Sequence, residues 1–138
     1  MTPLIAALIV TCMMAPAPAG LPASVTEPYL RIQTALAGDK TDGVKADALA
    51  IAAAAKELEE AEKIAEPARQ LAQAKDIEAA RKTFGVLSEE LVARAGKSGD
   101  ELKIAYCPMA GKHWLQKGSS IRNPYFGNDM LTCGEIQK

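Results

Sequence analysis

Aromatic residues, histidine and cysteine are all scarce in this chain. Only 4% of its 138 residues are aromatic, and it has one histidine, one tryptophan and three cysteines. So few aromatic side chains leave a core that is built mainly from small aliphatic contacts. A single histidine supplies no complete set of nucleophile, base and orienting group, and we predict that the protein is not an enzyme. The one catalytic arrangement that the residues suggest is a dyad of Cys107 and His113, which a cysteine disulfide would abolish.

Several common binding signatures are also missing. The net charge is −1 and the isoelectric point is near 5.9, so no basic excess indicates a nucleic-acid partner or an anionic membrane surface. The chain has no G-x-x-x-x-G-K-[ST] loop, which argues against a nucleotide site. It has no C-x-x-C-H segment for c-type haem and no C-x-x-C pair typical of a zinc site.

The N-terminal segment "MTPLIAALIVTCMMAPAPA", residues 1–19, has the pattern of a secretory signal peptide. Its apolar run, residues 4–14, is too short to span a bilayer. Residues 17–19 form an A-x-A site that predicts cleavage before Gly20. We therefore expect an exported protein with no stable membrane insertion after cleavage. The alternatives are a retained N-terminal anchor and a lipid attached to Cys12.

Apolar residues recur at helical spacing along most of the remaining chain. The pattern predicts helices over residues 24–37, 41–66 and 76–100. Pro67 is expected to break or kink the second helix, and Asp76 is expected to cap the third.

The length predicts a single domain over residues 20–138, with a helical bundle at 20–99 and a cysteine- and methionine-containing segment at 100–138. Amphipathic helices with short connections are buried most simply in an antiparallel bundle. We therefore predict an all-α fold, a small bundle of three to four helices with the irregular cysteine-containing C-terminal segment packed on it.

Two C-terminal stretches, "YCPMAGKHWLQ" and "MLTCGE", concentrate the residues that can bind a soft metal ion. Cys107 and Met109 flank a proline in the first, and Met130 and Cys133 are three residues apart in the second. Thiolates and thioethers together favour Cu(I) over hard cations. If the two stretches meet, these four residues and His113 form a candidate metal site.

A disulfide is the alternative for the same cysteines. After signal cleavage only Cys107 and Cys133 remain, and an even pair in an exported protein is by default a disulfide. Closing a loop of this length would stabilise a small domain by roughly 3 kcal/mol. In that case Met109 and Met130 are core-filling residues and His113 is a solvated loop residue. The residues alone leave both interpretations open.

The C-terminal segments resemble a known family. The chain is similar to a small exported domain of unassigned function that also occurs fused to periplasmic adaptor subunits of copper and silver efflux systems. The resemblance covers nearly the whole mature chain, and its motifs are Tyr106–Ala110, Trp114–Gln116, Asn123–Gly127 and Met130–Glu135. It implies a helical bundle with the cysteine-containing segment folded against it.

The resemblance also implies a function, the handling of heavy metals in the periplasm. We expect a non-enzymatic accessory protein that binds Cu(I) or a similar soft ion and passes it to an efflux adaptor or a metallochaperone. The alternative is a structural interaction module of the cell envelope with a permanent Cys107–Cys133 disulfide.

Overall fold

The structure is a computed structural model that describes residues 20–138. The predicted signal peptide, residues 1–19, lies outside the described residues. The elements in chain order are α1 (Ala23–Ala37), α2 (Val44–Ala54), η1 (Ala55–Glu57), α3 (Glu62–Ala72), α4 (Ile77–Ala95), β1 (Leu102–Cys107), β2 (Lys112–Lys117), η2 (Gly127–Asp129) and β3 (Glu135–Gln137). Within residues 20–138, no helix is long and apolar enough to cross a membrane.

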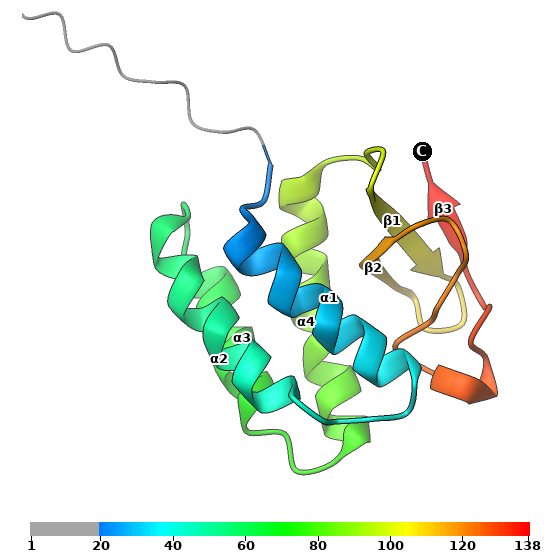
Figure 1. The fold of residues 1–138 in the computed structure, drawn as a ribbon, viewed down its shortest axis with the longest axis horizontal. Coiled ribbons are helices and arrows are strands. Elements are labelled where there is room, and N and C mark those ends of the chain that lie inside the picture. The colour runs from blue at the N-terminus through cyan, green and yellow to red at the C-terminus, as the bar shows by residue number, and fades with distance from the viewer. Residues whose placement is uncertain (1–19) are drawn as a thin grey trace, which may run out of the picture.

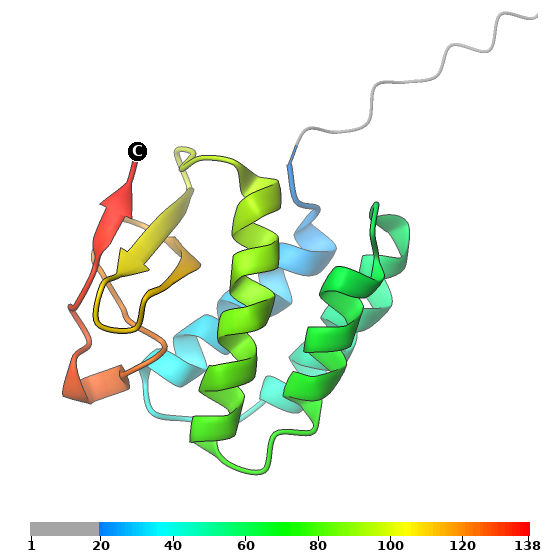
Figure 2. The same cartoon turned by 180° about the vertical axis from the view of Figure 1, so that it is seen from behind.

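The four helices and the sheet are arranged side by side (Figure 1). Helices α1 and α4 lie in the middle, with α2 and α3 on one side and the sheet on the other, which is also visible from behind (Figure 2). One hydrophobic core joins the helices to the C-terminal segment, since Phe84 of α4 and Trp114 of β2 are both fully buried members of it.

The prediction of an all-α fold is wrong, because the C-terminal segment contains an antiparallel sheet of three strands in the order β2-β1-β3. Only β1 shows an alternating pattern in the sequence. Strand β2 buries three consecutive residues, Trp114 to Gln116, so the period of two that marks a half-buried strand is absent. Strand β3 has three residues and exists through its pairing with β1, a non-local contact that no local pattern records.

The hydrogen-bonding groups on the outer edge of β2 are taken up by side chains. The backbone N–H of Leu115 donates to the Tyr29 hydroxyl over 3.0 Å, and the N–H of His113 donates to Glu89 over 2.6 Å. The Tyr125 hydroxyl donates to the carbonyl of His113. An exposed strand edge is a site of unwanted pairing, and here the helices cover it.

The second predicted helix is divided in two. The chain leaves the helical conformation at Leu58, and Glu60 has a left-handed φ of 51° before α3 begins. Helix α3 then continues through Pro67, where the break was expected. The division lets α2 and α3 fold back on each other and bury small residues such as Ala48 and Ala68. Tertiary packing therefore outweighs the high helix propensity of this stretch.

Helix α4 confirms the third predicted helix. Asp76 is its N-cap residue, and the carboxylate accepts a hydrogen bond of 2.8 Å from the N–H of Ala79. The predicted apolar face is buried at Phe84, Leu87 and Leu91. This helix holds the side of the core on which β2 packs.

Replacing Asp76 with alanine is expected to lower the free energy of unfolding by about 1 kcal/mol, because the Ala79 N–H loses its acceptor. Urea unfolding followed by circular dichroism measures the change. Asp42→Ala is the matched control, since Asp42 is an exposed loop aspartate with no side-chain hydrogen bond to any described residue. Equal losses in the two variants would contradict a capping role for Asp76.

Candidate thiol site

Cys107 ends strand β1 and begins the turn to β2. The turn closes with a hydrogen bond of 2.8 Å from the N–H of Gly111 to the carbonyl of Cys107. Gly111 has a positive φ of 64°, a conformation that suits glycine. The Cys107 side chain is fully buried, and its sulfur accepts a hydrogen bond of 3.4 Å from the N–H of Ala110. The turn therefore places the amide of Ala110 against the Cys107 sulfur.

Cys133 reaches the same place from the end of the chain. It lies two residues before β3, in which Glu135 pairs with Tyr106, the residue that precedes Cys107. Gly134 connects Cys133 to β3 and has a positive φ of 142°. A Cβ at this position would lie 2.8 Å from the Trp114 side chain. The pairing of β3 with β1 therefore brings the second cysteine to the first.

Asn123 holds the loop that carries Cys133. Its side chain is fully buried, and its Nδ2 donates to the carbonyl of Cys133 over 2.8 Å. Its Oδ1 accepts from the N–H of Tyr125 over 2.8 Å. The backbone N–H of Asn123 also donates to the carbonyl of Leu131 over 2.8 Å. One buried amide therefore connects both ends of the loop.

The two cysteine sulfurs are 3.1 Å apart. Both thiols are free in this structure, because a disulfide requires a separation of roughly 2.0 Å. Cys107 is buried, whereas Cys133 is partly exposed. The structure thus contains an adjacent thiol pair with one buried and one accessible member.

The surroundings make the two thiols unequal. Burial opposes ionisation of Cys107, but hydrogen bonds from Cys133, from the backbone of Ala110 and from the Asn123 side chain outweigh it, and the pKa of Cys107 lies below its usual value. The hydrogen bond from Cys133 to Cys107, together with desolvation, raises the pKa of Cys133. The first proton therefore leaves the pair at Cys107, and Cys133 keeps its proton in the bond between them.

The two methionines differ in how exposed they are. Met109 belongs to the turn after Cys107 and is 68% exposed. Met130 is half-buried and turns the chain toward Cys133, whose N–H donates to its carbonyl over 3.0 Å. Met109 is therefore the more accessible thioether.

His113 lies away from the cysteines. In the ladder Tyr106 is opposite His113 and Cys107 is opposite Lys112, so Cys107 and His113 face opposite sides of the sheet. The Nδ1 of His113 is 3.1 Å from Glu89 on α4, and its ring centroid lies 4.6 Å from that of Tyr106. Across residues 20–138, no group of three histidine, cysteine or acidic side chains converges as a metal site would require.

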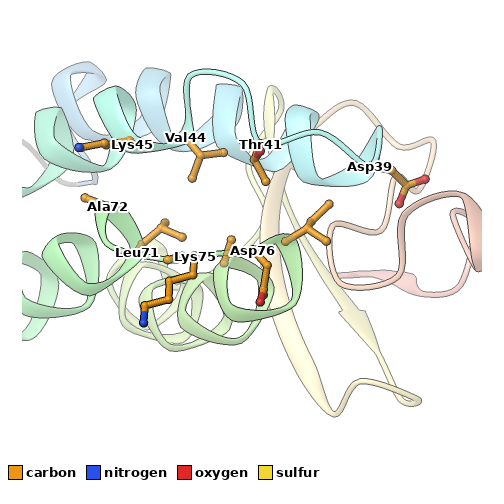
Figure 3. Close-up of a pocket in the computed structure, with 11 residues that line it drawn as sticks. Asp39, Thr41, Val44, Lys45, Leu71, Ala72, Lys75 and Asp76 are labelled. Atoms are coloured by element: carbon orange, nitrogen blue, oxygen red, sulfur yellow. The ribbon is translucent and has the colours of Figure 1, made fainter.

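A cleft of ≈ 300 Å³ lies elsewhere, between the α1–α2 connection and the start of α4 (Figure 3). Val44 of α2 lies opposite Leu71 of α3 in it, and Asp39 stands at one end. Its lining residues run from Asp39 to Ala80, so it contributes nothing to the thiol pair.

Sequence reasoning missed Asn123 as part of this site, because Asn-Pro is an ordinary turn signal. The signal that was available is that this asparagine opens the segment "NPYFG" ten residues before Cys133.

A family model described as "Protein of unknown function (DUF3347)" matches residues 25–102. The match covers more than half of the 138 residues and ends in β1, before either cysteine of the pair. No curated protein matches the chain. No solved structure matches it either.

Proposed function

This chain belongs to the family described as "Protein of unknown function (DUF3347)", and we propose that it is a non-enzymatic accessory protein that binds a soft ion such as Cu(I) and passes it on. The ligands are the thiolates of Cys107 and Cys133. The observation that carries the proposal is the convergence of these two sulfurs to 3.1 Å from segments 26 residues apart.

The surroundings of Cys107 support a ligand role. A metal binds the thiolate and not the thiol. Hydrogen bonds from Cys133, from the turn amide of Ala110 and from the Asn123 side chain outweigh burial and lower the pKa of Cys107, so deprotonation of this thiol is favoured in the free protein. Two bonds of roughly 2.3 Å from a metal to sulfur require the sulfurs to move apart from 3.1 Å, and the partly exposed Cys133 is the one free to move.

Thioethers complete the proposed ligand set. The Met109 side chain belongs to the turn that wraps Cys107 and is exposed, so rotation about its side-chain bonds brings its sulfur toward an ion at the pair. Met130 stands three residues before Cys133 and is the second thioether candidate. His113 is left out of this set because it faces away from Cys107 and contacts Glu89 of α4.

The proposed location and the proposed partner are inferred from the C-terminal motifs. Their resemblance to domains fused to adaptor subunits of copper and silver efflux systems supports a periplasmic location. It also supports an efflux adaptor or a metallochaperone as the partner. Transfer would proceed by ligand exchange, in which the partner's soft ligands replace Cys133 first and Cys107 last.

Anaerobic titration of the reduced protein with Cu(I), in competition with a chromophoric chelator, tests the proposal. A Cys12→Ser background leaves Cys107 and Cys133 as the only thiols. We expect one Cu(I) bound with a dissociation constant below micromolar, and a loss of more than roughly 100-fold in Cys107→Ser and in Cys133→Ser. Met109→Leu is expected to weaken binding less than either cysteine replacement.

Reduced protein that binds Cu(I) no tighter than micromolar would sink the proposal. The same distance of 3.1 Å also favours a second candidate, a permanent disulfide in a structural interaction module. A thiol count on protein taken directly from the cell envelope separates the two. A fully oxidised pair, combined with unchanged copper tolerance in Cys107→Ser cells, would select the structural module.

A further inference from the structure

We propose that Cys133 is a thiol-exchange site: small or protein thiols enter and leave the Cys107–Cys133 pair through the Cys133 sulfur. The ligand class is a thiol or its disulfide. This inference concerns the thiol pair of the proposed function and adds its regulation, because a disulfide between the two sulfurs removes both proposed metal ligands.

Access to the two sulfurs is one-sided. Cys107 is fully buried beneath its turn, and Cys133 is partly exposed. Thiol–disulfide exchange depends on which sulfur the incoming thiolate can reach. In the oxidised pair, an incoming thiolate therefore reaches Cys133 and not Cys107.

The buried thiol, Cys107, is the leaving group of this reaction, and a contact on the buried side stabilises its thiolate. Attack on Cys133 expels Cys107 as a thiolate, and the turn amide of Ala110 lies 3.4 Å from that sulfur. An N–H aimed at the departing sulfur stabilises the thiolate as it forms, so the geometry favours cleavage in this direction.

The exchange balances in two steps. A thiolate of a dithiol reductant attacks Cys133, so that a reductant–Cys133 bond forms, the Cys107–Cys133 bond breaks and Cys107 leaves as a thiolate. The second thiolate of the reductant then attacks its own sulfur in the mixed disulfide and releases the Cys133 thiolate, and the Cys107 and Cys133 thiolates each take up a proton from solvent. The protein disulfide is reduced to two thiols and the reductant is oxidised to its disulfide.

The reduced pair is stabilised by contacts that the disulfide loses. The hydrogen bond between the two cysteines exists only in the reduced state, and the Ala110 amide beside Cys107 interacts most strongly with a thiolate. Stabilising the reduced form makes a disulfide easier to reduce. The disulfide of this pair is therefore easily reduced, so oxidation removes the proposed metal ligands reversibly.

Trapping the mixed disulfide tests the assignment. The full chain in a Cys12→Ser background is oxidised to the Cys107–Cys133 disulfide, treated with glutathione, quenched by alkylation and mapped by mass spectrometry. We expect glutathione on Cys133 and the alkyl group on Cys107, in an excess of about tenfold or more over the reverse pattern. Equal labelling, or glutathione mainly on Cys107, would overturn the proposal, as would a pair that no disulfide oxidant can close.

Single-cysteine variants give a second measurement that needs no disulfide. In the Cys12→Ser background, Cys107→Ser leaves only Cys133, and Cys133→Ser leaves only Cys107. The lone Cys133 is expected to react with an aromatic disulfide reagent about tenfold faster or more than the lone Cys107, with both folds checked by circular dichroism. Equal or reversed rates in folded protein would contradict the one-sided access.

No metal is used in either assay, so the inference and the proposed function fail separately. Exchange at Cys133 without Cu(I) binding removes the proposed function and leaves the exchange site. Cu(I) binding together with exchange at Cys107 removes the exchange site and leaves the proposed function.

Discussion

Replacing Arg81 with methionine is expected to lower the free energy of unfolding by roughly 3 kcal/mol, because two hydrogen bonds from a charged donor to carbonyls are lost. Arg81 belongs to α4 and is only 8% exposed. Its Nη2 donates to the carbonyl of Leu36 over 2.9 Å, and its Nε donates to the carbonyl of Pro124 over 3.0 Å. These bonds join α1, α4 and the C-terminal segment at one point.

The Arg81 cluster is completed by Asp39 and Gly127. Asp39 has a left-handed φ of 57°, lies 2.7 Å from Arg81 Nη2 and accepts a further hydrogen bond from the N–H of Asn128. Gly127 presses directly on the pair, since a Cβ there would lie 2.0 Å from Asp39 and 2.5 Å from Arg81. The loop that carries Cys133 is thus anchored to the helices by one buried guanidinium.

Urea unfolding of Arg81→Met measures the loss, and two variants control it. Arg69→Met removes an arginine whose ion pairs on α3 are exposed, and it is expected to change the free energy of unfolding by less than about 0.5 kcal/mol. Arg81→Lys keeps the charge but lacks the planar fork, so we expect it to restore only part of the stability. Arg81→Met within 0.5 kcal/mol of wild type, on the scale of an exposed substitution, would contradict an anchoring role.

The same cluster gives the stability a dependence on pH. The hydrogen bond from Arg81 lowers the pKa of the Asp39 carboxyl in the folded protein. A carboxyl with a lowered folded pKa stabilises the fold above its unfolded pKa, and that contribution is lost as the pH falls through the folded pKa. The difference in stability between wild type and Arg81→Met is therefore expected to shrink as the pH falls below about 4.

The parts of the fold that could be predicted are those with local signals. Helix α4 has its capping aspartate at Asp76 and its apolar face at Phe84, Leu87 and Leu91, so short-range spacing is enough to define it. The sheet has no such signal. Three consecutive buried residues hide β2, and β3 depends on a partner 31 positions away in the sequence, as the pair Ala105–Ile136 shows.

Some parts of the candidate site could likewise be predicted from the sequence, and others could not. Thiol and thioether chemistry can be inferred from residue types, so Cys107 and Cys133 could be identified as one pair from the sequence. Their role as metal ligands stays a prediction. The face of the sheet on which His113 lies depends on strand register. Its closeness to Cys107 in the sequence therefore does not bring the two side chains together. The role of Asn123 depends on complete burial, which a sequence does not record.

Replacing Asn123 is expected to affect both the fold and the chemistry of the pair. Asn123→Ala removes the donor to the carbonyl of Cys133 and the acceptor of the Tyr125 N–H, and the latter group is buried. A buried polar group without a partner costs about 1–3 kcal/mol, so we expect the free energy of unfolding to fall by roughly 3 kcal/mol. Urea unfolding measures this loss.

Asn123→Asp separates the chemical effect from the structural one. Aspartate keeps the Oδ1 acceptor for Tyr125, loses the amide donor and brings a negative charge to the thiols. Both changes disfavour the Cys107 thiolate, because the Asn123 side chain is one of the donors that lower its pKa. In a Cys12→Ser background, the first step of thiolate formation, followed by ultraviolet absorbance, is expected to move up by about one pH unit.

The control for this shift is Asn128→Asp, which adds the same charge to the same segment at an exposed position. It is expected to leave the first thiol step where it is, because charge exposed to solvent is strongly screened. A first step that does not move in folded Asn123→Asp, or that moves equally in the two variants, would contradict the direct action of Asn123 on Cys107. If it moves only in Asn123→Asp, the residue that folds the loop also sets the ionisation of the thiol pair. The rate of exchange at Cys133 should then fall in that variant as well, because Cys107 becomes a poorer leaving group.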